Sequence, residues 1–230
     1  MYFYNDYKKY GEDKVPSFMY TDFGVYVPTE YSIYGIDVSR YQNRINWEEV
    51  AKMEVQDINI DFAFIKATEG KYMKDKRFKE NWVESKKHGI TRGAYHYYLP
   101  DGNPKTQADN FIESVELLPG DLPPVIDIED RGLAAHKIFI RDIHIFLDKI
   151  TAFCNCKPIV YSYDSFYNDY LENHVDGYPL WLARYGPKPD NAQFHFWQFI
   201  DRANVDGIGS KVDMNVFSGD STAFSNLLLR

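Results

Sequence analysis

The stretch "PPVIDIED" (residues 123–130) is a buried-strand pattern that ends in acidic residues. Its apolar residues suit a protein interior, whereas an unpaired charge is costly to bury and is rarely placed there without a function. Because side chains alternate across a strand, Asp127 and Glu129 project to one face while Ile126 and Ile128 project to the other. The pattern therefore predicts two carboxylates side by side at the end of a buried strand. Such a pair marks either an active site or a solvated loop.

The segments around this stretch alternate between two periodicities. Expected strands at 33–39, 62–70, 91–100, 123–130 and 157–163 alternate with expected helices at 45–53, 75–89, 106–120 and 136–154. Strands that are apolar on both faces and alternate with helices indicate a parallel sheet. Three more strands, at 179–185, 194–200 and 212–218, follow too closely for full helices between them. The sequence thus predicts an α/β fold, a TIM-like β/α barrel with five βα units followed by three strands with reduced helices.

An open, doubly wound sheet is the alternative architecture. It would normally carry a Gly-rich phosphate loop after its first strand, and "GIDVSRYQ" (35–42) is not one. We expect residues 33–219 to form the barrel, residues 1–32 an N-terminal extension, and residues 220–230 a C-terminal tail that packs on the barrel. The charges in "MYFYNDYKKYGEDKVP" (1–16) do not suit a signal peptide, and no apolar run reaches membrane-spanning length.

Composition excludes some partners and favours others. The formal net charge of −8 and the lack of a basic stripe argue against nucleic acid, whose phosphates would be repelled. Cys154 and Cys156 complete no zinc pattern, so no metal or redox role is expected for them. The aromatic share of 17%, with 19 tyrosines, suits a polar ligand with flat faces such as a sugar, although Tyr also serves as a core residue.

In a β/α barrel, functional residues gather at the C-terminal ends of the strands. The residues at these ends are Asp37, Lys66, Glu69, Tyr95, His96, Tyr97, Asp127, Glu129, Tyr161, Tyr163, Trp181, Trp197 and Gln198, while Asp213 begins the eighth strand and is less securely placed. Tyr95 and Tyr97 face away from His96, and we favour the Tyr pair as the inward one.

Clustered carboxylates repel, so at least one of them should keep its proton near neutral pH. A protonated carboxyl group beside ionised ones is what a glycosidase uses to protonate the leaving oxygen and to stabilise an oxocarbenium-like centre. A site for Mg²⁺ or Ca²⁺ is the rival chemistry, since both bind carboxylate oxygens. That reading leaves the aromatic surround unexplained and lacks a phosphate-handling loop, so sugar hydrolysis fits better.

Seven segments, in order and spacing, resemble glycoside hydrolase family 25, the Chalaropsis-type lysozymes (N-acetylmuramidases). They are "GIDVSRYQNRINWEEV", "FAFIKATEG", "RGAYHYYLP", "PPVIDIED", "KPIVYSY", "PLWLARY" and "FWQF…VDMNVF", and the likeness runs from about Tyr34 to Phe217. The resemblance implies hydrolysis of the β-1,4 bond between N-acetylmuramic acid and N-acetylglucosamine in peptidoglycan, without metal or cofactor. It also implies residue roles.

Under this resemblance Glu129 is the proton donor, Asp127 is its close partner, and Asp37 and Asp213 complete the acidic cleft. The residues expected to contact the glycan are Lys66, Tyr97, Tyr161, Tyr163, Trp181 and Gln198. The expected partner is the glycan strand of peptidoglycan, and we expect a monomer that is secreted or periplasmic. A catalytically silent glycan-binding barrel and a glycosidase acting on a chitin-like polymer stay open as alternatives. The sequence also leaves open whether a bound water or the substrate's own N-acetyl group attacks.

Overall fold

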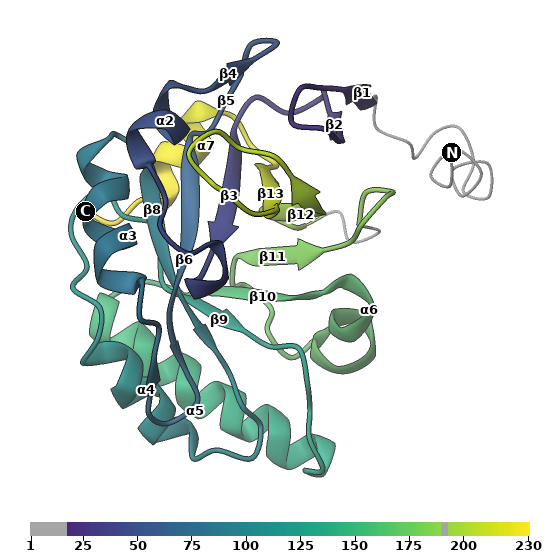
Figure 1. Ribbon diagram of the computed structural model, residues 1–230. Helices are drawn as coiled ribbons and strands as arrows, with labels where there is room; N and C mark the ends of the chain where they lie inside the picture. Colours follow the sequence, from purple (N-terminus) through teal and green to yellow (C-terminus); the bar gives the residue numbers. More distant parts are fainter. Residues whose placement is uncertain (1–17, 190–192) are drawn as a thin grey trace.

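Eight strands form a closed barrel in the computed structural model, which describes residues 18–189 and 193–230 (Figure 1). They are β3 (Tyr34–Val38), β6 (Phe62–Glu69), β8 (Thr91–Tyr97), β9 (Val125–Asp127), β10 (Ile159–Tyr163), β11 (Leu180–Ala183), β12 (Phe196–Ala203) and β13 (Val212–Phe217). Each strand pairs with its neighbour in the order β3-β13-β12-β11-β10-β9-β8-β6, and pairing of β3 with β6 closes the ring. The predicted barrel of five βα units and three closely spaced strands is confirmed.

The last strand runs against the others. β13 is antiparallel to both β12 and β3, whereas the other neighbouring strands of the barrel are parallel. An antiparallel pair can be joined by a short loop, while a parallel pair needs a long crossover, usually a helix. This explains why no full helix separates β12 from β13. It also brings the start of β13 to the same end of the barrel as the C-terminal ends of the parallel strands.

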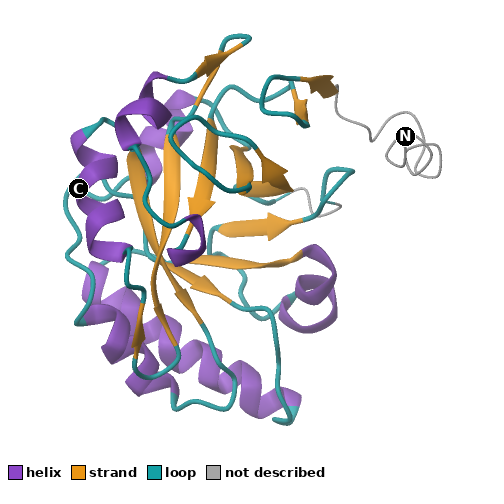
Figure 2. Ribbon diagram, in the orientation of Figure 1, coloured by secondary structure: helices purple, strands orange, loops and turns teal. Residues whose placement is uncertain are grey.

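Helices cover the outside of the barrel, mostly along one side (Figure 2). They are η2 (Arg40–Gln42), α2 (Trp47–Lys52), α3 (Phe78–Lys87), α4 (Pro104–Ile112), α5 (His136–Cys154), α6 (Asp164–Phe166), η3 (Tyr167–Leu171) and α7 (Ser221–Leu227), with short strand pairs formed by β1 (Phe18–Tyr20) and β2 (Tyr26–Pro28), by β4 (Glu54–Val55) and β5 (Ile58–Asn59), and by β7 (Met73–Lys74) with β6.

Most of the predicted elements differ from the observed ones by one to three residues at their ends, and two differences have a clear structural cause. The helix expected over 106–120 ends at Ile112, where the Ser114 hydroxyl donates to the Asn110 carbonyl at 2.6 Å, a local side-chain bond that competes with helix continuation. The strand expected at 194–200 extends to Ala203, because β12 continues its ladder with β13 beyond the barrel.

The core has two layers, on either side of the strands. Ile126 and Ile128 belong to the outer layer, between strands and helices, while Val125 belongs to the layer inside the barrel. The interior is aromatic, and at Gly35 an added Cβ would lie 2.5 Å from the ring of Phe62. Glycine is therefore required where that ring meets the neighbouring strand.

One end of the barrel interior is closed by the C-terminal helix. Phe224 of α7 is buried, and its ring lies 5.2 Å from that of Phe217 and 5.8 Å from that of Phe62, measured between centroids. This contact lies within the tail at 220–230, which we expected to pack on the barrel. The other end, at the C-terminal ends of the parallel strands, is the mouth.

Part of the N-terminal extension is also packed on the barrel. Phe23, in the turn of the β1–β2 hairpin, and Val27, in β2, are fully buried in the outer layer. The backbone N–H of Asn204 donates to the Phe23 carbonyl at 2.8 Å. Trp197 is a correction to the expected mouth residues. It is fully buried in the outer layer, with its ring 6.3 Å from that of Phe18, because it alternates with Gln198 along β12.

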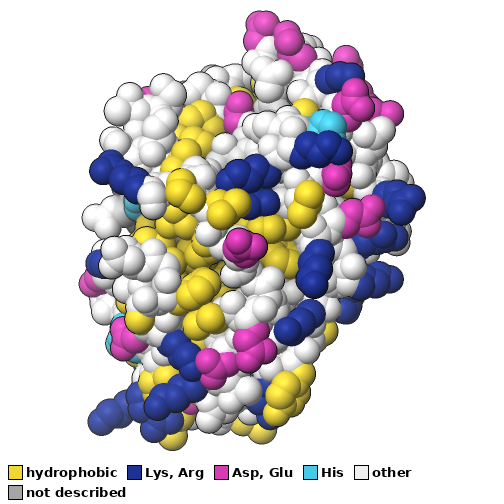
Figure 3. Space-filling model, turned by 90° about the vertical axis from the view of Figure 1, so that its left-hand side faces the viewer, with side chains coloured by type: hydrophobic (Ala, Val, Ile, Leu, Met, Phe, Trp, Pro, Cys, Tyr) yellow, Lys and Arg dark blue, Asp and Glu magenta, His cyan; other side chains and the backbone are white. Residues whose placement is uncertain are grey.

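The surface is mixed in charge. Figure 3 shows the side that carries the C-terminus, where hydrophobic side chains gather in the middle of the face and Lys, Arg, Asp and Glu surround them. None of the helices in the described part of the chain is long and apolar enough to cross a membrane.

Candidate active site

A cleft of about 230 Å³ opens at the mouth of the barrel. It brings together all ten residues that the sequence analysis assigned to the site: Asp37, Lys66, Tyr97, Asp127, Glu129, Tyr161, Tyr163, Trp181, Gln198 and Asp213. The remaining side of the lining comes from Val38, Ser39, Tyr41, Gln42, Tyr95 and Tyr185, of which Tyr95 stood at an expected strand end and Tyr185 was missed. Tyr185 is the last residue of the strand expected at 179–185 and lies two residues beyond the observed end of β11, so its place at a strand end was the available signal.

Backbone hydrogen bonds hold the two central carboxylates on one face, with Asp127 at the end of β9 and Glu129 just beyond it. The Tyr98 amide donates to the Asp127 carbonyl at 2.9 Å, and the Ile128 amide donates to the Tyr161 carbonyl at 3.0 Å. The backbone therefore stays extended between its two neighbours although β9 itself ends at Asp127. Glu129 lines the cleft with Asp127 while Ile128 is buried on the other side, so the predicted alternation is confirmed.

The Asp127 and Glu129 carboxyl groups lie in one buried environment, where the ionisation of either one disfavours the ionisation of the other. Asp127 is 6% exposed, and burial together with the Glu129 charge raises its pKa well above the ordinary range. Burial also raises the pKa of Glu129. Two effects act in the opposite direction and lower it: the hydrogen bond that the Tyr97 hydroxyl donates to Glu129 Oε2 at 3.4 Å, and the charge of Lys66. Two coupled carboxyl groups of this kind retain one proton between them well above the pH at which an isolated carboxyl group loses it.

A second pair of acids lies across the cleft. Asp37 Oδ2 accepts two bonds of 2.8 Å, from Gln198 Nε2 and Asn215 Nδ2. Burial raises the Asp37 pKa to about 6 against the lowering effect of these two amides. Asp213 stands opposite Asp37 in the β13–β3 register, and burial and the Asp37 charge raise its pKa to about 9. The antiparallel direction of β13 therefore settles the placement of Asp213.

Asn215 is a site-supporting residue that the sequence reasoning did not assign. It is fully buried, it donates to Asp37, and its Oδ1 accepts from Trp181 Nε1 at 2.8 Å. Its position two residues after Asp213, on the same face of a strand, was the available signal. Its amide joins the acidic cleft to the aromatic floor.

Aromatic rings form the floor and the walls. Trp181 is 2% exposed and is stacked on Phe64 at 4.2 Å between centroids, so it is the floor of the cleft. The Tyr161 hydroxyl donates to Gln198 Oε1 at 3.0 Å, which orients the amide that holds Asp37. Tyr163 is 39% exposed and stands at the rim. The cleft thus has a rigid apolar base beneath polar groups.

Lys66 is the buried cation of the site. Its Nζ lies 2.7 Å from Glu69 Oε2 and 4.6 Å from the centre of the Tyr97 ring. Its charge lowers the pKa of both Asp127 and Glu129, so it limits the rise caused by burial.

His96 faces away from the cleft, as the interpretation of an inward Tyr pair required. Its Nδ1 lies 2.7 Å from Thr68 Oγ1, its ring stacks on Phe146, and burial lowers its pKa to about 3. It is a neutral core residue. Within residues 18–189 and 193–230, no group of three or more His, Cys, Asp and Glu side chains is arranged to hold a metal ion.

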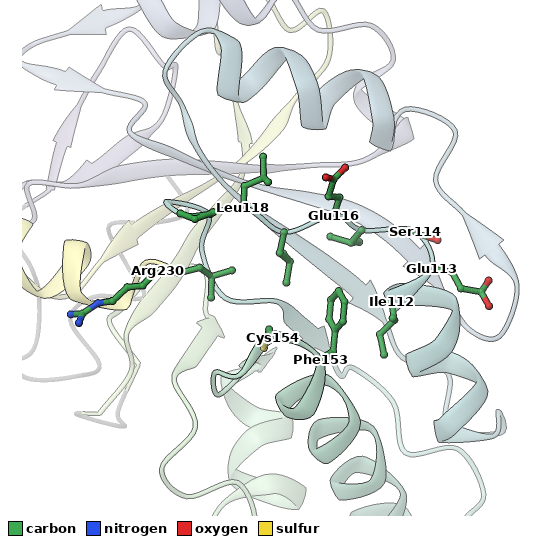
Figure 4. A pocket seen from close by; sticks show the side chains of 12 residues that line it. Ile112, Glu113, Ser114, Glu116, Leu118, Phe153, Cys154 and Arg230 are labelled. Atoms are coloured by element: carbon green, nitrogen blue, oxygen red, sulfur yellow. The ribbon is translucent and has the colours of Figure 1, made fainter.

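A larger cavity, of about 630 Å³, lies away from the mouth (Figure 4). It is bordered by the end of α4, the loop that follows it, the end of α5 and the last two residues of the chain. Phe153 and Leu118 border it, whereas the charged groups of Glu113 and Arg230 point away from its centre. Size alone favours this cavity, but convergent acids with raised pKa values mark the smaller cleft as the candidate active site.

A β/α barrel whose mouth holds proton-sharing carboxyl groups between aromatic walls has the features of a glycoside hydrolase. Comparison with known families agrees: the model of "Glycosyl hydrolases family 25" matches residues 36–208, and the chain belongs to this family.

Individual relatives extend the likeness over most of the chain. The protein is 42% identical to the uncharacterized protein YegX of Escherichia coli K12 over 200 aligned residues. The alignment covers 86% of this chain and 74% of YegX. It is 31% identical to lysozyme M1 of Streptomyces globisporus, over 82% of this chain and 69% of the relative. Among solved structures, a family 25 glycosyl hydrolase from Bacillus anthracis aligns with a TM-score of 0.79 at 32% identity, covering 86% of this chain and 94% of the other.

Proposed function

We propose that the protein is a lysozyme, an N-acetylmuramidase that hydrolyses the β-1,4 bond between N-acetylmuramic acid and N-acetylglucosamine in peptidoglycan. Membership of family 25 and the likeness to lysozyme M1 support this substrate. The observation that carries the chemistry is the buried Asp127–Glu129 pair, whose raised pKa values keep a proton available where the substrate binds.

Glu129 is the general acid in this proposal. It is the less buried of the two carboxyl groups, so it can reach the glycosidic oxygen, whereas Asp127 lies beneath it. As Glu129 transfers its proton to the leaving oxygen, the C–O bond breaks and positive charge develops at the sugar carbon. For this step the proton that the pair shares lies on Glu129. Asp127, which is then ionised, stabilises that charge, or orients the substrate's acetamide if the N-acetyl group is the nucleophile. Water then completes the hydrolysis, and its proton restores the acid.

Asp37 and Asp213 add negative potential around the developing cation. In this proposal the glycan is bound by the floor and walls of the cleft, which comprise Lys66, Tyr97, Tyr161, Tyr163, Trp181 and Gln198. The partner is the glycan strand of peptidoglycan, which places the site of action outside the cytoplasm, in a secreted or periplasmic protein that acts as a monomer. Neither a cofactor nor a metal takes part in the proposed steps.

The test is digestion of purified peptidoglycan by the wild type and by Glu129→Gln, with mass spectrometry of the borohydride-reduced fragments. Fragments that end in reduced muramic acid, absent with the variant, are expected. Fragments that end in reduced glucosamine would show that the protein is a glycosidase but that it cleaves the other glycosidic bond of the strand. Activity on chitin oligomers equal to that on peptidoglycan would favour the chitin-like alternative. No fragments from either protein, with glycan binding retained, would favour a silent glycan-binding barrel.

A further inference from the structure

The β1–β2 hairpin carries a pair of exposed aromatic side chains. Tyr20 and Tyr26 are partners in the hairpin register, and they are 59% and 54% exposed. Their ring centroids are 5.3 Å apart and the ring planes meet at 71°, so the two rings form an open corner. Their neighbours Phe23 and Val27 are buried in the core, which fixes the hairpin that presents this corner.

The corner stands over an apolar pocket of about 180 Å³. Besides the two tyrosines, its lining is mostly apolar, from Phe18, Val25, Phe199 and Ile200, and Arg202 adds one charged group. Phe199 and Ile200 are themselves almost fully buried, so the base of the pocket is part of the packed wall of β12. An apolar hollow with two tyrosines at its edge offers ring faces and hydroxyl groups to the same ligand, the combination that a sugar requires.

The pocket lies next to the catalytic cleft. Tyr185 lines the cleft, and the following residue, Gly186, lines the hairpin pocket. Along β12, Gln198 lines the cleft while Phe199 and Ile200 belong to the outer layer and line the pocket, so the wall of the barrel separates the two hollows at this strand. The hairpin and the loop after β11 lie on the same side of the molecule in Figure 1. A polymer that leaves the cleft across Tyr185 and Gly186 would therefore meet the tyrosine corner.

We infer that the tyrosine corner, Tyr20 and Tyr26 with the pocket beneath them, is a binding subsite for sugar units of the glycan strand outside the catalytic cleft. The inference rests on the proposed function, because it takes the substrate to be an N-acetylated glycan. The apolar face of a pyranose ring packs on tyrosine faces, and an acetamide methyl group suits the hollow below. The hairpin precedes the segment at 36–208 that matches the family model, so the two tyrosines lie outside that match while Phe199 and Ile200 at the base of the pocket lie within it.

The experiment compares two peptide-free substrates that differ in length. One is a tetrasaccharide long enough only for the cleft, and the other is the long glycan strand left after an amidase has removed the stem peptides. For Tyr20→Ala/Tyr26→Ala, KM for the long strand should rise roughly tenfold through loss of the two aromatic contacts. The kcat on both substrates and the KM for the tetrasaccharide should stay at wild-type values. Phe153→Ala, at the distant cavity, is the matched control and should change none of them.

Each result has one meaning. An equal effect on both substrates, or none on the long strand, overturns the subsite. The long strand with its stem peptides intact is measured as a third substrate. An effect that appears only with this substrate also overturns the subsite, and would assign the pocket to peptide. The single variants Tyr20→Ala and Tyr26→Ala, with thermal unfolding midpoints, separate loss of contact from loss of fold. Strand binding is also measured in the Glu129→Gln background. Hairpin-dependent binding there, combined with no hydrolysis by the wild type, would refute the lysozyme proposal but keep a glycan subsite.

Discussion

The two ends of the barrel interior are made by the same strands and have opposite chemistry. At the mouth, four buried or half-buried carboxyl groups crowd one cleft, and each has its pKa raised. At the closed end, Phe62, Phe196, Phe217 and Phe224 make ring contacts with centroids 5.0 to 5.8 Å apart. The difference separates function from stability: the closed end buries apolar area, whereas the mouth holds charges that lower stability but serve the reaction.

The largest expected effect is at the mouth. Glu129→Gln removes the transferable proton without changing shape, so peptidoglycan hydrolysis should fall roughly 10³-fold. The free energy of unfolding should not fall, because one of two repelling carboxyl groups becomes neutral. Glu116→Gln, an exposed position at the distant cavity, is the matched control. Near-normal turnover by Glu129→Gln would end its assignment as the acid.

The largest stability effect should come from the closed end. Phe62→Ala removes a fully buried ring that touches Phe64, Phe196 and Phe224, and should lower the free energy of unfolding by about 3–5 kcal/mol. The kcat of the remaining folded protein should stay close to wild type. Urea unfolding and turnover at low denaturant measure the two quantities. A loss of kcat as large as the loss of stability would show that the two ends are not separable.

Asn215 joins the acidic cleft to the aromatic floor, so its substitution should affect both stability and the pKa of Asp37. Asn215→Leu leaves Asp37 with one amide partner and the Trp181 N–H with none, at a cost of about 1–3 kcal/mol in stability. It should also raise the Asp37 pKa, since the lost bond lowers it in the wild type. NMR titration of Asp37 gives the direction, and chemical denaturation gives the cost. Asn215→Asp, which keeps the size but not the donor, is the companion variant; an unchanged Asp37 titration in both would refute the link.

A pH-dependent effect concerns Asp213. The usual pKa of this carboxyl group is 3.8 and its folded value is raised to about 9, so the folded state binds the proton more tightly than the unfolded state. The stabilisation that proton binding by Asp213 gives the folded state is fully present below the unfolded pKa of 3.8. It is lost progressively as the pH rises toward the folded pKa of about 9. Asp213→Asn should therefore stabilise the protein relative to wild type, more at about pH 8 than at about pH 5. Asp148→Asn, on the exposed face of α5, should show no such trend in melting temperature.

Much of the barrel was predictable because its first five units repeat a local pattern. The apolar strands and amphipathic helices up to residue 163 are each encoded within a few residues, and α5 (His136–Cys154) has the predicted limits. Element ends were less predictable where side chains intervene, as Ser114 does after α4. The inward direction of Trp197 was assigned wrongly because a strand buried on both faces gives no contrast between its sides.

The sequence by itself determined the alternation that sets Asp127 and Glu129 on one side and Ile126 and Ile128 on the other, since that follows from the geometry of any strand. The tertiary structure alone decided that β13 runs antiparallel, which brings Asp213 opposite Asp37, and that Asn215 joins Asp37 to Trp181. It also decided that Phe224 closes one end and that the hairpin tyrosines stand beside the other. These features depend on contacts between segments far apart in the chain, and no local pattern encodes them.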